Sequence, residues 1–120
     1  MKRLYFKPGS KVISEGELGD CAYIVEAGRL EVSQINVQNN KQILCQLKEN
    51  DIFGELGLID GLPRSATVTA LDNCTIKVLT RQSFNSLTST NPKALMPIFK
   101  VLASRLRSTL KLVSSAPNHA

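Results

Sequence analysis

The glycines of this 120-residue chain are confined to its first half. There are seven of them, at Gly9, Gly16, Gly19, Gly28, Gly54, Gly57 and Gly61, and none follows Gly61. Glycine permits the left-handed backbone conformations of tight turns, and it weakens the interior of a helix. This distribution therefore predicts a tightly turned front rich in strands and a helical back.

Strand patterns occupy the front. The segment "DCAYIVEAGRLEV", residues 20–32, holds two β-rich runs with a turn at Ala27–Gly28, which predicts a hairpin. Further strands are expected at about Lys41–Leu47 and at "CTIKVLT", residues 74–80.

The alternation in "SATVTA", residues 65–70, adds information on curvature. It places Ala66, Val68 and Ala70 on one face, and such small inward side chains suit a tightly curved sheet. We expect a mainly β fold with some α-helix: an antiparallel β-roll, similar to a jelly-roll barrel, with one short inserted helix and helices at the carboxyl end.

Helical patterns begin at Thr80. "TRQSFNSL" predicts a short helix with Thr80 as its cap, and the segment 91–113 predicts a long helix with Asn91 at the N-cap and Pro92 at the first position. Pro97 lies inside that long helix and is expected to kink it. We expect a single domain over residues 1–120, with the roll at about 4–80, the helices at about 81–113 and a frayed tail at 114–120.

An apolar stripe runs along the long helix. Its members, spaced by three and four residues, are Leu95, Phe99, Leu102, Leu106 and Leu110. Two interpretations stay open: the stripe packs against the β-domain of its own chain, or it forms the seam of a dimer.

Composition limits the classes of function. The chain carries a net charge of +5 and one histidine, His119, so no Ser–His or Cys–His pair and no histidine-based metal site can form in the core. We expect no enzyme, no metal, no cofactor and no direct binding of nucleic acid, because the basic residues fit solvated faces. Cys21, Cys45 and Cys74 form no CxxC pair and are expected to be buried, reduced thiols. The polar start and the lack of a membrane-length apolar run predict a cytoplasmic protein without a membrane segment.

The segment "FGELGLIDGLPRSATVTA", residues 53–70, carries the candidate chemistry. A short helix starting near Gly54 would present free N–H groups to an anion, and Arg64 can return to that point if "IDGLP" forms a turn. Ser65 adds a hydroxyl, so these groups describe a cradle for one phosphate. Glu55 would repel a phosphate but suits a neighbouring sugar hydroxyl, which indicates a nucleotide. The alternative is that Glu55 only favours the start of the helix and pairs with Arg64 at the surface.

The same segment resembles the phosphate-binding cassette of cyclic nucleotide-binding domains, with FGE, a short helix, and PR followed by two small residues and an alternating strand. "FKPGSKVISEGELGDCAYIVEAGRLEV" is similar to the opening strands of that family, and the likeness extends over about residues 6–113. The resemblance implies that the short helix is a phosphate-cassette helix and that the fold is the β-roll of that family.

The resemblance also implies roles for individual residues. Glu55 would accept a hydrogen bond from the ribose 2′-hydroxyl, and Arg64 would pair with the cyclic phosphate. The cradle would be completed by Gly54, which lets the backbone approach the sugar, by the N–H groups around Leu56 and of Ala66, and by the Ser65 side chain. Thr109 falls where catabolite-activator-type proteins place a base-contacting threonine, although Leu110 follows it where those proteins have a serine. Ser65 favours cAMP as the ligand, with cGMP as the alternative.

Two hypotheses on function follow. In the first, the chain is a regulatory domain that senses a cyclic nucleotide and couples its binding to movement of the C-terminal helix, which contacts an effector domain or a second copy. In the second, it is a ligand-independent dimerisation module with a degenerate pocket. The chain begins close to the first strand and ends after the long helix, so we expect either a free-standing sensor or a fragment that lacks its effector.

Overall fold

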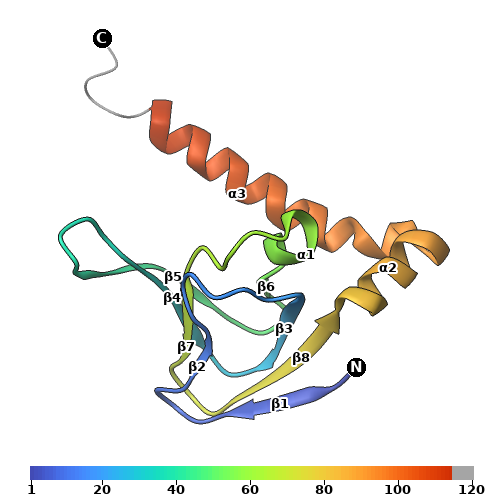
Figure 1. Cartoon of the computed structure of the whole chain (residues 1–120), viewed down its shortest axis with the longest axis horizontal. Coiled ribbons are helices and arrows are strands. Elements are labelled where there is room, and N and C mark those ends of the chain that lie inside the picture. Colours follow the sequence, from blue (N-terminus) through green and yellow to red (C-terminus); the bar gives the residue numbers. More distant parts are fainter. Residues whose placement is uncertain (115–120) are drawn as a thin grey trace. The chain divides into compact units, whose positions relative to one another are not determined.

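A computed structural model describes the backbone of residues 1–114 and the side chains of residues 1–107. It divides into two compact units, Met1–Phe84 and Asn85–Ala120 (Figure 1). The first unit contains the strands, one short helix and the start of a second helix, and the other unit contains the rest of the helical part. The expectation of a single domain over the whole chain stays a prediction.

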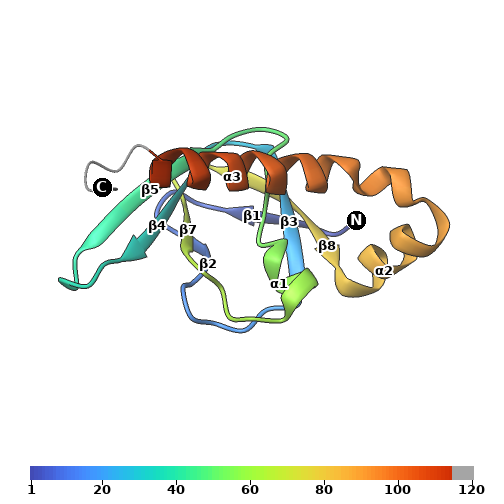
Figure 2. The same ribbon diagram turned by 90° about the horizontal axis from the view of Figure 1, so that it is seen from above.

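The first unit is a roll of two antiparallel sheets, which confirms the predicted fold class (Figures 1 and 2). One sheet has the strand order β1-β8-β3-β6 and the other has the order β2-β7-β4-β5. The elements in chain order are β1 (Arg3–Phe6), β2 (Lys11–Ile13), β3 (Cys21–Ala27), β4 (Leu30–Ile35), β5 (Lys41–Leu47), β6 (Ile52–Phe53), α1 (Leu56–Asp60), β7 (Thr67–Ala70) and β8 (Cys74–Thr80).

The hydrophobic core lies between the two sheets, because each sheet contributes four residues to one buried cluster. The members are Val25, Phe53, Cys74 and Ile76 from the first sheet, and Leu30, Leu47, Val68 and Ala70 from the second. The alternation in β7 is as predicted, since Ala66, Val68 and Ala70 are all buried. These small side chains let the curved sheets approach each other closely.

The predicted hairpin at residues 20–32 is wrong. β3 pairs with β8 and β6, whereas β4 pairs with β5 and β7, so the two consecutive strands belong to different sheets. Gly28 turns the corner with φ of +91° and packs directly on Asn73 and Cys74, where a β-carbon would lie 2.6 Å from the Asn73 carbonyl oxygen. A tight glycine turn is common to hairpins and to sheet corners, so the sequence pattern could not distinguish them.

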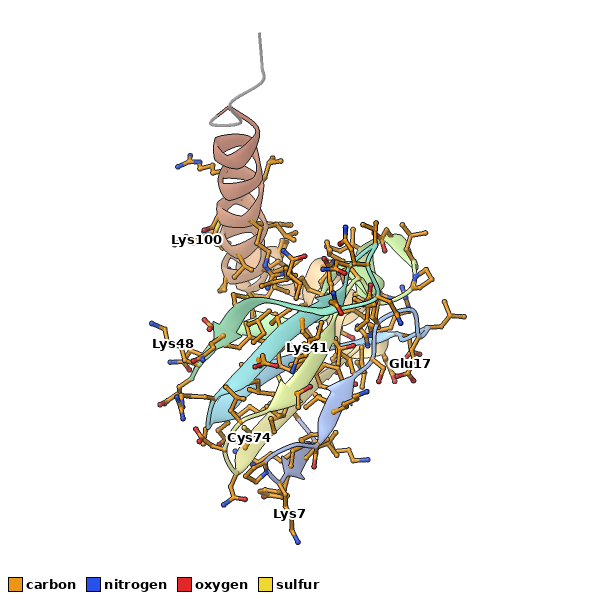
Figure 3. The ribbon with its side chains drawn as sticks, turned by 90° about the vertical axis from the view of Figure 1, so that its left-hand side faces the viewer. Lys7, Glu17, Lys41, Lys48, Cys74 and Lys100 are labelled. Carbon is orange, nitrogen blue, oxygen red and sulfur yellow. The ribbon has the colours of Figure 1, made fainter. Side chains whose placement is uncertain are left out.

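The prediction of buried cysteines holds for Cys74 but fails for Cys45, and Cys21 is half-buried. Cys45 is exposed because β5 is the edge strand of its sheet, and β4 and β5 extend from the roll as a long hairpin (Figure 1). Figure 3 labels Cys74 on β8 and Lys41 at the start of β5. Lys41 pairs with the nearly buried Glu31 across that hairpin.

The helices begin where the strands end. α2 (Arg81–Thr90) is capped as predicted, since the Ser83 N–H donates to Thr80 Oγ1 at 3.1 Å. It starts in the first unit and ends in the second. Among the residues that the structure describes, no helix combines the length and the apolar character that crossing a bilayer requires.

The predicted start of the long helix is wrong. Pro92 opens a 3₁₀ turn, η1 (Pro92–Leu95), and α3 (Met96–Ser114) begins after it. In a regular α-helix the Lys93 carbonyl would accept from the N–H of residue 97, which proline lacks. Here the Lys93 carbonyl accepts from the Met96 N–H instead, so it does not need a donor at Pro97. Pro97 therefore lies in the first turn of α3, where proline is tolerated, instead of kinking the middle of a helix.

The apolar stripe of α3 is buried unevenly. Leu95 is 4% exposed, whereas Phe99 and Leu106 are 51% and 60% exposed. The side chain of Leu110 and the tail residues 115–120 lie outside the described part of the chain, while Ser114 ends α3. What the stripe packs against stays a prediction.

Candidate functional site

The segment between β6 and β7 folds back on itself, as its sequence predicts. Gly54 takes φ of +75° after β6, and α1 then runs from Leu56 to Asp60. Gly61 ends the helix in the left-handed conformation with its N–H donating to the Gly57 carbonyl, and the Leu62 N–H donates to Asp60 Oδ1 at 2.9 Å. Glycine is favoured at such a left-handed cap because a β-carbon would be strained there. The turn returns the chain to Gly54 at Arg64.

The backbone of Arg64 is held by the loop between β2 and β3. Its N–H donates to the Glu17 carbonyl at 2.7 Å, and its carbonyl accepts from the Gly16 N–H at 2.8 Å. Glu17 is labelled in Figure 3, within this loop. Two hydrogen bonds on either side of one residue fix the point from which the arginine side chain starts.

The side chain of Arg64 is buried and points back to Gly54. Nη1 donates to the Gly54 carbonyl at 2.8 Å, and Nη2 donates to the Cys21 carbonyl at 2.9 Å. The guanidinium carbon lies 5.7 Å from the centre of the Tyr23 ring. With only 7% of its surface exposed, Arg64 is not the surface charge of the alternative interpretation.

The Arg64 side chain packs against neutral groups of β3 and of the cassette. It contacts two backbone carbonyls, the Cys21 sulfur at 4.0 Å and the Tyr23 ring. Burying a cation is costly, and an anion that reaches its remaining donors would offset that cost. The guanidinium fork still has donors left to offer, because it carries five N–H groups.

Three glycines surround the guanidinium. A β-carbon would lie 2.3 Å from Nη2 at Gly19, 2.8 Å from Nη1 at Gly54 and 3.3 Å from Nη1 at Gly57. Contacts below 3.0 Å are essentially never made by real β-carbons. The arginine therefore occupies a space walled largely by backbone, which a side chain at Gly19 or Gly54 would fill.

Glu55 lies between the two glycines of the cassette and is fully buried, with 0% of its surface exposed. It is the N-cap residue of α1, with φ of −68° and ψ of −25°, and its side chain makes no capping hydrogen bond. The alternative interpretation gave Glu55 a role in favouring the start of this helix. No capping hydrogen bond from its side chain supports that role. Its burial instead places a carboxylate inside the same turn as Arg64.

The other predicted residues are more exposed or lie elsewhere. Leu56 starts α1 and is 42% exposed, and Ser65 is exposed while its carbonyl accepts from Gln34 Nε2 at 2.8 Å. Ala66 is buried just before β7. Thr109 belongs to α3, and its side chain lies outside those that the structure describes. The structure thus brings Gly54 and Arg64 into direct contact and keeps Glu55, Leu56, Ser65 and Ala66 next to them in the chain.

Sequence reasoning missed the contribution of β3 to this site. Cys21 and Tyr23 alternate onto one face of β3, and the Cys21 thiol donates to the Tyr23 hydroxyl at 3.2 Å. Burial, and then the hydrogen bond with Cys21, raise the pKa of Tyr23 to about 12. The available signal was the spacing of two between Cys21 and Tyr23, which places both side chains on one face of a strand, but nothing local indicated Arg64 as their neighbour.

The chain is similar to known proteins over most of its length. Residues 3–91 match the family described as "Cyclic nucleotide-binding domain". Over 81 residues the chain is 41% identical to the cAMP-dependent protein kinase regulatory subunit of Yarrowia lipolytica, which covers 68% of this chain and 21% of that protein. The chain thus spans about a fifth of the length of this curated relative.

Solved structures share the fold. The catabolite activator protein of Thermus thermophilus has a TM-score of 0.87 and 27% identity, covering 94% of this chain and 55% of that one. The cAMP-bound form of the EAL enzyme Bd1971 has a TM-score of 0.70 and 35% identity, covering 94% of this chain and 30% of that one, and the same enzyme is known in a cGMP-bound form. These proteins couple a similar domain to different larger chains. Together with the match over residues 3–91, they place this chain in the cyclic nucleotide-binding domain family.

Proposed function

We propose that this chain is a regulatory domain that binds cAMP and transmits the binding to its C-terminal helices. The observation that carries the proposal is the buried guanidinium of Arg64, 7% exposed, which donates to the Gly54 and Cys21 carbonyls and lies beside the Tyr23 ring. A cyclic phosphate carries one negative charge and two exocyclic oxygens, which match the remaining donors of a guanidinium fork.

The other predicted site residues, in the cassette and in α3, are assigned roles that fit this ligand. Glu55 accepts a hydrogen bond from the ribose 2′-hydroxyl, and Gly54 leaves room for the sugar. The backbone near Leu56, the Ser65 hydroxyl and the Ala66 N–H complete the phosphate cradle, and Thr109 contacts the base. Support comes from the direct bond between Arg64 and the Gly54 carbonyl and from the complete burial of Glu55.

The choice of cAMP over cGMP has support from Ser65 and from the kinase regulatory subunits among the relatives, which are named for dependence on cAMP. The EAL enzyme Bd1971 is known with either nucleotide. We therefore treat cGMP as the competing ligand in the binding test.

A path for transmission starts at Arg81, the first residue of α2. Its Nη1 donates to the Leu58 carbonyl and its Nη2 to the Gly57 carbonyl, each at 3.1 Å. These carbonyls belong to α1, the cassette helix, and all three residues lie in the first unit. A shift of α1 on ligand binding would thus be passed to the start of α2, which continues into the second unit.

The proposal places the domain in the cytoplasm as a regulatory rather than catalytic module, whose partner is an effector domain or a second copy. The regulatory relatives support this assignment, and the EAL enzyme shows that such a domain can be attached to a catalytic one. A ligand-independent dimerisation module is the competing function, which the exposed Phe99 and Leu106 side chains would serve.

The test is titration calorimetry of cAMP and cGMP on this chain, after any nucleotide carried through purification has been removed. We expect Arg64→Ala to weaken cAMP binding by about 2–5 kcal/mol, or about 1.5 to 3.5 decades in affinity. Arg29→Ala is the matched control, because Arg29 is 59% exposed and pairs with Asp72 outside the cassette. Undetectable binding of both nucleotides by the wild-type chain would overturn the proposal that it senses a cyclic nucleotide. Equal affinity of Arg64→Ala and wild type would overturn the assignment of Arg64 to the phosphate cradle.

A further inference from the structure

We propose that Tyr23 is a positioning residue that sets the plane of the Arg64 guanidinium, and that Cys21 holds the Tyr23 ring in place. This inference rests on the proposed function, because an oriented guanidinium matters for an anion that is recognised by a fork of hydrogen bonds. It extends the candidate site from the cassette to β3.

The orientation of the Arg64 guanidinium depends on several contacts. Nη1 donates to the Gly54 carbonyl and Nη2 to the Cys21 carbonyl, and the covalent bond at Nε ties the plane to a flexible side chain. Changes in the torsions of that side chain can still tilt the guanidinium about the two hydrogen bonds. The Tyr23 ring, 5.7 Å from the guanidinium carbon, restrains this tilt. That distance is within the range of about 6 Å in which an aromatic ring attracts a cation.

The Tyr23 ring is itself well anchored. It stacks on Phe53 with the ring centres 5.2 Å apart and an angle of 23° between the planes, and Phe53 is only 3% exposed. The hydroxyl of Tyr23 accepts a hydrogen bond from the Cys21 thiol at 3.2 Å. Because both the face and the hydroxyl of the ring are held, the ring can support the Arg64 guanidinium.

Cys21 connects the two elements of this support. Its carbonyl accepts from Arg64 Nη2, and its thiol contacts Tyr23, two residues further along β3. The backbone bond does not depend on the identity of the side chain, whereas the thiol contact does. A Cys21→Ala variant therefore keeps the carbonyl bond to Arg64 and removes the sulfur, which contacts the Tyr23 hydroxyl at 3.2 Å and Arg64 Nη2 at 4.0 Å.

The variants Tyr23→Phe and Tyr23→Leu test the role of the ring. Tyr23→Phe keeps the aromatic face and loses only the hydroxyl contact with Cys21, so we expect it to bind cAMP within about twofold of wild type. Tyr23→Leu keeps apolar volume but loses the aromatic face, and we expect its affinity to fall by about 2- to 30-fold. Cys21→Ala loses the same hydroxyl contact and also the sulfur that lies 4.0 Å from Arg64 Nη2, so its affinity should lie between those of Tyr23→Phe and Tyr23→Leu. Ile76→Val is the control for a loss of core packing, since Ile76 is fully buried in the roll and outside the cassette.

Two readouts separate a positioning role from a structural one. If Tyr23 acts through Arg64, Tyr23→Leu should have no further effect on affinity in an Arg64→Ala background. In the ligand-free protein, NMR should resolve distinct Arg64 guanidinium N–H signals in wild type and Tyr23→Phe, and averaged or broadened ones in Tyr23→Leu.

The outcomes distinguish this inference from the proposed function. Wild-type affinity in Tyr23→Leu, or an equal loss with and without Arg64, would overturn the positioning role even if cAMP binds as proposed. Absence of cyclic nucleotide binding in the wild-type chain would overturn the proposed function, while the ligand-free NMR spectra would still support or overturn the orientation of Arg64 by Tyr23.

Discussion

Gly19 lies so close to Arg64 that a β-carbon on Gly19 would be 2.3 Å from Nη2, the atom that donates to the Cys21 carbonyl. Backbone strain is not the reason for glycine at this position, because Gly19 does not adopt the left-handed conformation found at Gly16 or Gly54. Glycine is needed here because any side chain would occupy the space of the Arg64 guanidinium. Gly19, in the loop before β3, therefore contributes to the site that the cassette forms.

Gly19→Ala should therefore weaken cAMP binding more than it destabilises the fold. The methyl group must push the guanidinium out of its place, which sacrifices charge-assisted hydrogen bonds and lowers affinity by about 10- to 100-fold. Calorimetric titration and thermal unfolding of the same sample measure the two effects.

Gly9→Ala is the matched control for that experiment. Gly9 has φ of +87° with open space around a β-carbon, so alanine there is strained without touching the site. We expect a loss of about 1–2 kcal/mol in stability and unchanged affinity. A Gly19→Ala protein that binds cAMP as tightly as Gly9→Ala would show that the close contact with Arg64 has no part in binding.

Glu55 is expected to recognise the ribose 2′-hydroxyl, and a modified ligand can test this directly. For wild type, replacing cAMP by 2′-deoxy-cAMP should lower affinity by about 2- to 10-fold, the worth of one hydrogen bond. Glu55→Gln should lose less than Arg64→Ala, since an amide oxygen can still accept from a hydroxyl. Glu55→Ala should bind the two ligands equally, because it offers nothing to the hydroxyl. If Glu55→Ala still prefers cAMP as strongly as wild type does, the ribose contact is made by another group.

The relation between sequence and structure differs for local and distant contacts. The turn that returns Arg64 to Gly54 was predictable, because its helix start, glycine cap and Asx turn are all encoded within ten residues. The sheet corner at Gly28 and the exposed edge at Cys45 depend on which strands become neighbours, and local patterns do not contain that information. The bond from Arg64 to Cys21 spans 43 positions, so the support from β3 became visible only in the folded chain.

Arg81 should be required for transmission from the cassette to α2. Arg81→Gln removes a guanidinium that donates to the Gly57 and Leu58 carbonyls of α1. Because Arg81 is exposed, the loss of stability should be modest, about 0.5–1.5 kcal/mol. The larger effect is expected in hydrogen exchange: cAMP should change the exchange of α2 backbone N–H groups in wild type and change it less in Arg81→Gln.

Lys100→Gln provides the control for removing a positive charge from the helical part of the chain, since Lys100 is exposed on α3 (Figure 3). It should leave the response of α2 to cAMP unchanged. Arg81→Lys keeps the charge but lacks the fork, so its response should lie between those of wild type and Arg81→Gln. An undiminished response in Arg81→Gln would mean that the signal reaches α2 by another route.

The ionisation of Tyr23 gives a measure of its burial that does not require a ligand. Burial, followed by the hydrogen bond with Cys21, raises the pKa of Tyr23 from 10.0 to about 12, against a smaller lowering by Arg64. The folded state therefore holds the phenol proton more tightly than the unfolded state does. This difference in pKa stabilises the folded state. The stabilisation is fully present below about pH 10 and is lost as the pH rises toward about 12. Ultraviolet absorbance of phenolate in wild type, minus that of Tyr23→Phe, isolates this transition because the chain has two tyrosines. A difference curve with its midpoint near pH 10 would contradict the partial burial of Tyr23, and with it the fixed ring that we place against Arg64.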